Sequence, residues 1–177
     1  MTFGQEPTEH MVSIVSKNGN WGFPEIKPFQ NLLIHPFNSS LHYAVQCYEG
    51  LKAYKNEKGE VRLFRPECNM YRFKVSSKKI ALPDFNGEEL LKILESYVRT
   101  ESDWIPAHPG YSLYIRPFHF ALENSLGVKS PSSSQILIVA SPVGPYYPSG
   151  FNPIKLTTTT QYSRSAPGGT GSFKVGG

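Results

Sequence analysis

A run rich in proline, glycine and serine constrains the fold of this chain more than any other feature. The run reads GPYYPSG at residues 144–150 and separates two strand-like segments. Because neither a helix nor a strand continues through such a run, it marks a boundary between structural units. We therefore expect a small domain over residues 1–143, an interdomain linker over residues 144–152, and the first part of a larger domain over residues 153–177.

The apolar pattern before the linker predicts both helices and strands. Pro66 suits a first helical turn, and apolar side chains recur at helical spacing after Glu88 and Glu89. Helices are expected at residues 39–48, beginning at Ser39 or Ser40, and at residues 66–82 and 88–98. Strands are expected at residues 10–15, 30–34, 51–54, 61–64, 112–117, 135–140 and 154–160, with a loop at 21–28 and a hairpin turn at 56–59. Because strands precede, separate and follow the helices, we expect an α+β fold.

One lysine lies in a glycine-lined bend, GGTGSFKVGG at residues 168–177. Glycine allows positive φ and lets a bulky ligand come close to the backbone. A lysine held among apolar neighbours such as Phe173 and Val175 can lose its proton and become a nucleophile. Lys174 is therefore a candidate for a Schiff-base residue, although a flexible tail with a solvated lysine fits these ten residues equally well.

Composition and charge argue against several classes of protein. Hydrophobic residues make up 39% of the 177, which is typical of a globular chain, and Cys47 and Cys68 lie too far apart for a C-x-x-C pair. We find no secretory signal, no evident transit peptide and no apolar run of membrane length, so we expect a cytoplasmic protein that binds no membrane. The formal charge of +4 is scattered, and the five histidines show no ligand spacing. Neither nucleic-acid binding nor a metal site is expected.

Several motifs occur in the order found in the branched-chain amino acid aminotransferases, and the resemblance runs from Phe3 to Gly177. They are HYAVQCYEGLKAY at residues 42–54, RLFRP at 62–66, NMYR at 69–72, SLYIRP at 112–117, SLGV at 125–128, SPVGPY at 141–146 and the lysine segment. The resemblance implies a fold type IV enzyme that uses pyridoxal 5'-phosphate. It also implies a homodimer that transfers an amino group between leucine, isoleucine or valine and 2-oxoglutarate, giving branched-chain 2-oxo acids and glutamate in branched-chain amino-acid biosynthesis.

The same resemblance implies roles for individual residues. Lys174 would be the catalytic lysine that holds the cofactor, Arg72 would bind its phosphate, and Arg164 would belong to the cofactor region. Tyr114 and Arg116 would line the substrate pocket from one face of a strand, with Arg116 placed for the second carboxylate of glutamate or 2-oxoglutarate. The remaining substrate-binding positions are aromatic pocket walls and two loop residues that the family donates to the neighbouring subunit: Phe3, Tyr43, Tyr48, Tyr146, Leu126 and Val128.

Some parts of the family's site have no counterpart in residues 1–177. They include a tyrosine that bonds the cofactor phenolate oxygen and a glutamate that pairs with the pyridine nitrogen. We therefore expect residues 1–177 by themselves to be inactive. The alternatives are another fold type IV enzyme, a D-amino acid aminotransferase or an aminodeoxychorismate lyase, and a non-catalytic fragment that only dimerises. The blocks EGLKA at residues 49–53 and YIRP at 114–117 favour the branched-chain type.

Overall fold

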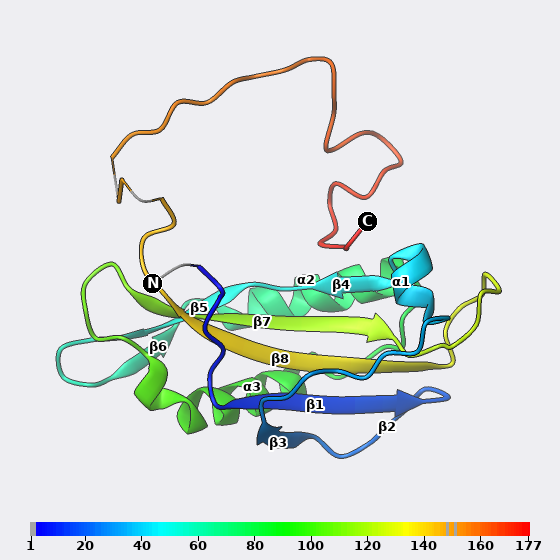
Figure 1. The fold of residues 1–177 in the computed structure, drawn as a ribbon, viewed down its shortest axis with the longest axis horizontal. Coiled ribbons are helices and arrows are strands. Elements are labelled where there is room, and N and C mark those ends of the chain that lie inside the picture. The colour runs from blue at the N-terminus through cyan, green and yellow to red at the C-terminus, as the bar shows by residue number, and fades with distance from the viewer. Residues whose placement is uncertain (1–2, 148, 151) are drawn as a thin grey trace.

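The computed structural model describes residues 3–147, 149–150 and 152–177, and an antiparallel sheet forms its centre (Figure 1). The strands are β1 (His10–Lys17), β2 (Asn20–Trp21), β3 (Glu25–Pro28), β4 (Gln46–Tyr48), β5 (Leu51–Lys55), β6 (Val61–Leu63), β7 (Ser112–Ala121) and β8 (Ser133–Val143). Their order is β2-β1-β8-β7-β5-β6, with β3 paired to β1 and β4 paired to β7. The long β7–β8 ladder runs from Ser112 opposite Val143 to Ala121 opposite Ser134.

The two long helices, α2 (Pro66–Lys79) and α3 (Gly87–Thr100), lie against one face of the sheet (Figure 1). The α3 helix begins at Asn86, whose side chain accepts hydrogen bonds from the backbone N–H groups of Glu88 and Glu89. A short helix, α1 (Ser39–Tyr43), precedes β4, and a 3-10 turn (Ser102–Trp104) follows α3. This mixture of helices and strands confirms the α+β prediction.

The main core lies between the helices and the sheet. Phe73, Leu94 and Tyr97 of the helices are fully buried against strand residues such as Leu113 and Ile115. Because side chains alternate along a strand, Tyr114 and Arg116 point to the other face of β7. The core therefore determines which face of the sheet carries the predicted substrate residues.

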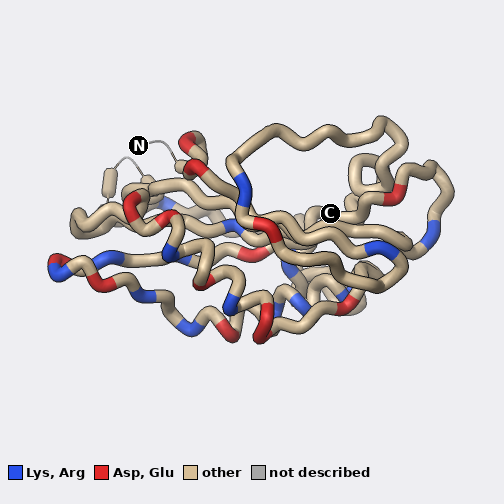
Figure 2. The backbone as a smooth tube through the Cα atoms, turned by 90° about the horizontal axis from the view of Figure 1, so that it is seen from below, with Lys and Arg blue, Asp and Glu red and all other residues tan. Residues whose placement is uncertain are grey.

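The expectations about local structure are largely confirmed. The structure contains both long helices, the hairpin of β5 and β6 around residues 56–59, and β1, β7 and β8, each longer than expected. Figure 2 shows Lys and Arg interspersed with Asp and Glu along the chain, in keeping with the scattered charge. No helix in the described part of the chain is long and apolar enough to cross a membrane.

Two predictions near the N-terminus are wrong. Residues 30–34 form no strand, and the strand lies instead at β3, inside the segment expected to be a loop. The short helix ends at Tyr43 rather than residue 48, because Ala44 adopts a left-handed φ of 52° and the next residues pair with β7 as β4. Its cap is Asn38, whose side chain accepts the N–H of Ser40. Pairing with β1 places the strand at β3, and pairing with β7 turns the residues expected at the end of the helix into β4.

The strand expected at residues 154–160 is also absent. All seven residues are exposed, and none pairs with a strand in the described part of the chain. A lone extended segment has no partner for its backbone groups except water, so its β pattern does not produce a strand. Pro148 and Phe151 of the expected linker lie outside the described residues. The domain bounds of 1–143, 144–152 and 153–177 stay a prediction.

Candidate active site

The lysine segment is bound to the edge of β4 and is not a free tail. The N–H of Tyr48 donates to the carbonyl of Lys174 at 3.0 Å, and the N–H of Gly176 donates to the carbonyl of Gln46 at 3.0 Å. Cys47 and Val175 form the antiparallel bridge between these two bonds. The backbone around Lys174 is therefore held at a defined place beside β4.

One face of α2 supports the same segment. The buried hydroxyl of Ser76 accepts the N–H of Lys174 at 2.9 Å, and the Lys79 ammonium lies 5.1 Å from the centre of the Phe173 ring. Asn69 and Arg72 precede these residues at intervals of three and four, which places all four on one stripe of the helix. This spacing is a signal that sequence reasoning missed for Ser76.

The side chain of Lys174 contacts Tyr48, a predicted substrate residue that Arg116 contacts as well. Its Nζ lies 4.4 Å from the centre of the Tyr48 ring, and the Arg116 guanidinium carbon lies 4.7 Å from the same centre. Arg116 donates from Nη2 to the Tyr114 hydroxyl at 2.9 Å. A lysine, an arginine and two tyrosines from three separate parts of the chain thus form one cluster.

Arg116 lies between two cavities of this cluster. One of about 610 Å³ is also lined by Phe3 and Tyr114, and one of about 390 Å³ is also lined by Tyr48 and Gly176. The Nε of Arg116 is buried and has no hydrogen-bond partner among the described residues. A buried donor without a partner is costly, so this atom suits an incoming anion.

Aromatic rings lie at the larger of these two cavities, which Phe3 and Tyr114 line. The Phe3 ring lies 5.0 Å from that of Tyr114 and 5.5 Å from that of Tyr146, measured between ring centres. Gly50 permits this arrangement, because a Cβ at that position would overlap with the Tyr114 hydroxyl and lie 3.0 Å from its Cζ. The structure therefore brings together six of the predicted residues: Phe3, Tyr48, Tyr114, Arg116, Tyr146 and Lys174.

Arg72 forms a two-pronged ion pair with Glu49, the residue after Tyr48. Its Nε lies 2.5 Å from Oε1 and its Nη2 lies 2.9 Å from Oε2. These hydrogen bonds raise the pKa of Arg72, so its charge is permanent. Sequence reasoning assigned no role to Glu49, because its burial against a helix far along the chain leaves no local signal.

Besides Arg72, four predicted residues lie outside the cluster. The Tyr43 hydroxyl donates to the carbonyl of Leu126 at 2.5 Å, Val128 is exposed, and Arg164 donates from Nη1 to the carbonyl of Gly171 at 3.4 Å. Within the described residues, no hydrogen bond or ion pair joins any of them to Lys174. Their expected duties in cofactor or substrate binding stay predictions.

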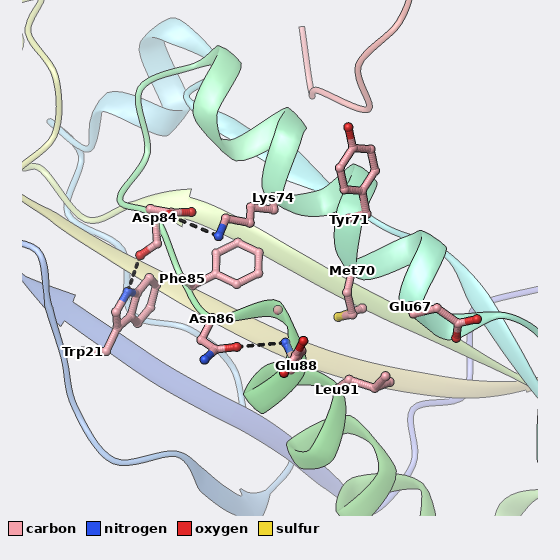
Figure 3. A pocket seen from close by; sticks show the side chains of 11 residues that line it. Trp21, Glu67, Met70, Tyr71, Lys74, Asp84, Phe85, Asn86, Glu88 and Leu91 are labelled. Carbon is pink, nitrogen blue, oxygen red and sulfur yellow. Dashed lines mark hydrogen bonds and ion pairs between the residues drawn. The ribbon is translucent and has the colours of Figure 1, made fainter.

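Another cavity, about 810 Å³, lies elsewhere, between α2, the start of α3 and Trp21 (Figure 3). There Lys74 Nζ lies 3.3 Å from Asp84 Oδ2, and the Trp21 indole N–H donates to the Asp84 carbonyl at 2.7 Å. These groups satisfy one another, and no predicted site residue lines the cavity. In the described ranges, no group of three or more His, Cys, Asp or Glu side chains could hold a metal ion.

Comparison with known proteins gives a consistent family resemblance, although no family model matches the chain. The chain is 48% identical over 99% of its length to the branched-chain-amino-acid aminotransferase of Dictyostelium discoideum, of which it covers 47%. Over its whole length it is 43% identical to the mitochondrial enzyme of that name from Schizosaccharomyces pombe and 44% identical to the cytosolic one from Ovis aries, of which it covers 42% and 46%. The chain thus spans less than half the length of the curated relatives it matches.

Solved structures agree with the sequence relatives. The branched-chain amino acid aminotransferase of Escherichia coli superposes with a TM-score of 0.61 at 26% identity, over 78% of this chain and 41% of that one. The T.th. branched-chain amino acid aminotransferase in complex with N-(5'-phosphopyridoxyl)-L-glutamate superposes with a TM-score of 0.53 at 25% identity, over 73% and 40%. These matches confirm the resemblance to the branched-chain aminotransferases and the fold type IV class predicted from the sequence.

Proposed function

We propose that the protein that carries this chain is a branched-chain amino acid aminotransferase that uses pyridoxal 5'-phosphate. It would transfer the amino group of leucine, isoleucine or valine to 2-oxoglutarate. The observation that carries the proposal is the position of Lys174, held by β4 and Ser76 with its amine over the Tyr48 ring, which Arg116 also contacts. The named relatives support this activity over a D-amino acid aminotransferase or an aminodeoxychorismate lyase.

The donor groups fit the cofactor. Arg72 offers the part of its guanidinium that Glu49 leaves open, which suits the phosphate, and Lys174 offers a primary amine for the aldehyde. When bound, the cofactor supplies an electron sink that stabilises negative charge at the substrate Cα. A similar enzyme has been solved with a phosphopyridoxyl-glutamate compound, which supports the same cofactor here.

The residues of this chain would then have separate roles in the reaction. The Lys174 amine would act as a base held within reach, taking the proton from the substrate Cα and passing it on to the cofactor. Arg116 binds the second carboxylate of 2-oxoglutarate, with its buried Nε as one donor. Phe3, Tyr114 and Tyr146 provide apolar surface that accepts a leucine, isoleucine or valine side chain and keeps water out.

The other predicted roles belong to the same proposal. Tyr43, Leu126 and Val128 would serve the neighbouring subunit of a homodimer, and Arg164 would lie in the cofactor region. We also propose a cytoplasmic location, although the relatives include both cytosolic and mitochondrial proteins. The inactivity expected of residues 1–177 by themselves stays a prediction.

The experiment that tests the function is Lys174→Ala in the protein that carries this chain. The variant should lose transamination between leucine and 2-oxoglutarate. After reduction with borohydride in the presence of pyridoxal 5'-phosphate, the wild-type peptide with Lys174 should carry the phosphopyridoxyl mass, and the variant should carry none there. Lys79→Ala is the control, because Lys79 contacts the same segment without a predicted role in chemistry. Labelling of another lysine alone would contradict the proposal.

A further inference from the structure

Glu49 is an acidic residue whose side chain has no exposure to solvent, with an exposed fraction of 0%. It follows β4 directly and is the neighbour of Tyr48, whose ring lies under Lys174. A buried carboxylate is costly unless its charge is paired and its oxygens accept hydrogen bonds. The groups that donate hydrogen bonds to the Glu49 carboxylate therefore explain how its charge can be buried.

The carboxylate of Glu49 accepts hydrogen bonds from three residues. Oε1 accepts from Arg72 Nε at 2.5 Å. Oε2 accepts from Arg72 Nη2 at 2.9 Å, from Asn69 Nδ2 at 2.8 Å and from the N–H of Gly50 at 3.1 Å. The fixed carboxylate thus holds the guanidinium of Arg72 at two adjacent atoms, which sets both its place and the direction of its plane.

This contact uses one edge of the guanidinium and leaves the other free. Arginine carries five N–H donors, and Glu49 takes the one on Nε and one on Nη2. Within the described residues, Arg72 forms no other side-chain hydrogen bond or ion pair. Its side chain is 50% exposed and lines a pocket of about 200 Å³ with Arg65, Cys68 and Asn69. An anion there would meet two guanidinium groups.

Glu49 and Arg72 differ in burial, and this difference decides which of the two holds the other in place. Glu49 is held by packing, whereas a half-exposed arginine without an anchor would sample many side-chain conformations. That freedom would be lost each time an anion bound, at a cost in affinity. The bond to Glu49 removes the freedom before binding, so the carboxylate prepares Arg72 for its ligand.

A second effect of Glu49 acts in the opposite direction. Its negative charge repels an incoming phosphate from behind the guanidinium. If repulsion outweighed positioning, removing the charge would strengthen phosphate binding, and if positioning prevails, removal weakens it. The sign of the change therefore separates the two effects.

We propose that Glu49 is a positioning residue, which holds the guanidinium of Arg72 with one edge free for the phosphate of the cofactor. The inference rests on the proposed function, because that function assigns the phosphate to Arg72. Glu49 itself touches neither the cofactor nor the substrate. Asn69 and the N–H of Gly50 complete the support by fixing the carboxylate.

The test compares two ligands that differ only in the phosphate, pyridoxal 5'-phosphate and pyridoxal, by spectral titration of the protein freed of cofactor. Glu49→Gln keeps the shape of the side chain and removes its charge. It should weaken binding of pyridoxal 5'-phosphate at least tenfold and change that of pyridoxal less than twofold. In an Arg72→Gln background, Glu49→Gln should have no further effect on either ligand, because the two residues act as a unit.

A matched control separates positioning from stability. Glu101 is 1% exposed and its Oε1 lies 2.6 Å from His10 Nδ1, so Glu101→Gln also removes a buried, paired carboxylate. We define the affinity ratio as the affinity for pyridoxal 5'-phosphate divided by that for pyridoxal. The Glu101→Gln variant should keep the wild-type affinity ratio even where its melting temperature falls. If Glu49→Gln does not fold, Asn69→Ala replaces it, since it removes one donor to Glu49 and leaves the ion pair intact. The affinity ratio should then fall at least threefold.

The outcomes distinguish this inference from the function on which it rests. An affinity ratio that stays the same or rises in Glu49→Gln, or in Asn69→Ala where that variant is used, would overturn the role of Glu49 and leave the proposed function standing. Equal affinities of the wild-type protein for the two ligands would overturn the phosphate role of Arg72 and the role of Glu49 together.

Discussion

The backbone N–H of Lys174 donates a hydrogen bond of 2.9 Å to the hydroxyl of Ser76, a residue 98 positions earlier in the chain. Ser76 is fully buried in α2, the helix that also carries Arg72. One rigid helix therefore positions both the amine and the arginine that the proposed chemistry requires. Precise placement of reacting groups is worth large factors in rate, so this single contact has a testable effect.

Ser76→Ala should loosen the segment around Lys174. Losing the hydrogen bond should cost about 1 kcal/mol of stability, and the poorer placement of the amine should lower kcat by roughly tenfold. Amide hydrogen exchange at Lys174 should become faster. Steady-state kinetics with leucine and 2-oxoglutarate, together with exchange measured by mass spectrometry, check both effects.

The neighbouring Ser77 provides a matched control. It is equally buried, but its hydroxyl contacts Cys47 Sγ at 3.2 Å and His119 Nδ1 at 3.0 Å rather than the lysine segment. Ser77→Ala should lower stability by a similar amount without faster exchange at Lys174. If the two serine variants behaved alike in both measurements, the contact with Lys174 would have no special role.

Arg116→Gln should separate the two classes of substrate. The arginine would pair with a carboxylate that 2-oxoglutarate has and leucine lacks. Its loss should therefore reduce kcat/KM for 2-oxoglutarate by an amount equivalent to about 1.5–3 kcal/mol of charge-assisted bonding, and that for leucine much less. Separate half-reactions with each substrate measure the two effects. Equal losses for both substrates would remove Arg116 from this role.

The sequence predicts best those elements that local patterns determine. Helical spacing after Glu88 and the turn at residues 56–59 depend on neighbours along the chain, and both are found as expected. By contrast, β3 and the end of α1 depend on pairing with β1 and β7, which local patterns do not show. The strand predicted at residues 154–160 fails for the same reason, since it has no partner among the described residues.

The candidate site follows the same division. Motifs identified Lys174, Arg116 and their aromatic neighbours because each motif is contiguous in the sequence. The supporting contacts from Glu49 to Arg72 and from Ser76 to Lys174 join residues 23 and 98 positions apart. Such contacts arise only from folding, so reasoning from motifs proposed the candidate reacting groups but not the residues that contact and support them.

Gly50→Ala should displace the Tyr114 ring. The new Cβ would overlap with the tyrosine hydroxyl, so the ring must move and release its hydrogen bond to Arg116. We expect a stability cost of about 1–3 kcal/mol and a several-fold higher KM for 2-oxoglutarate. Gly87→Ala is the control, because its Cβ would lie 3.7 Å from Met70 Cβ, an ordinary contact. A Gly50→Ala variant as stable and active as Gly87→Ala would show that Tyr114 tolerates the change.

His119 should make stability depend on pH. Its side chain has no exposure, and burial lowers its pKa from 6.5 to about 3. Between these values the unfolded chain binds a proton that the folded chain does not, so stability decreases as pH falls below 6.5 and gains nothing above it. The slope should approach about 1.4 kcal/mol per pH unit. The pKa of Glu123 is lowered from 4.5 to about 2, so the stability that this carboxylate adds is fully present above pH 4.5 and is lost only as pH falls below that value.

Urea denaturation at several pH values between 5 and 8 measures this slope. His119→Gln should flatten it below pH 6.5, because glutamine cannot take up the proton in either state. The His119 ring contacts the hydroxyl of Ser77 through Nδ1 and that of Ser134 through Nε2, the latter at 2.9 Å. Both hydroxyls can still form hydrogen bonds with the side-chain amide of glutamine, which limits the change in the fold. His108→Gln, at an exposed histidine, should leave the slope unchanged. Parallel curves for the wild type and His119→Gln would mean that the pH dependence comes from another group.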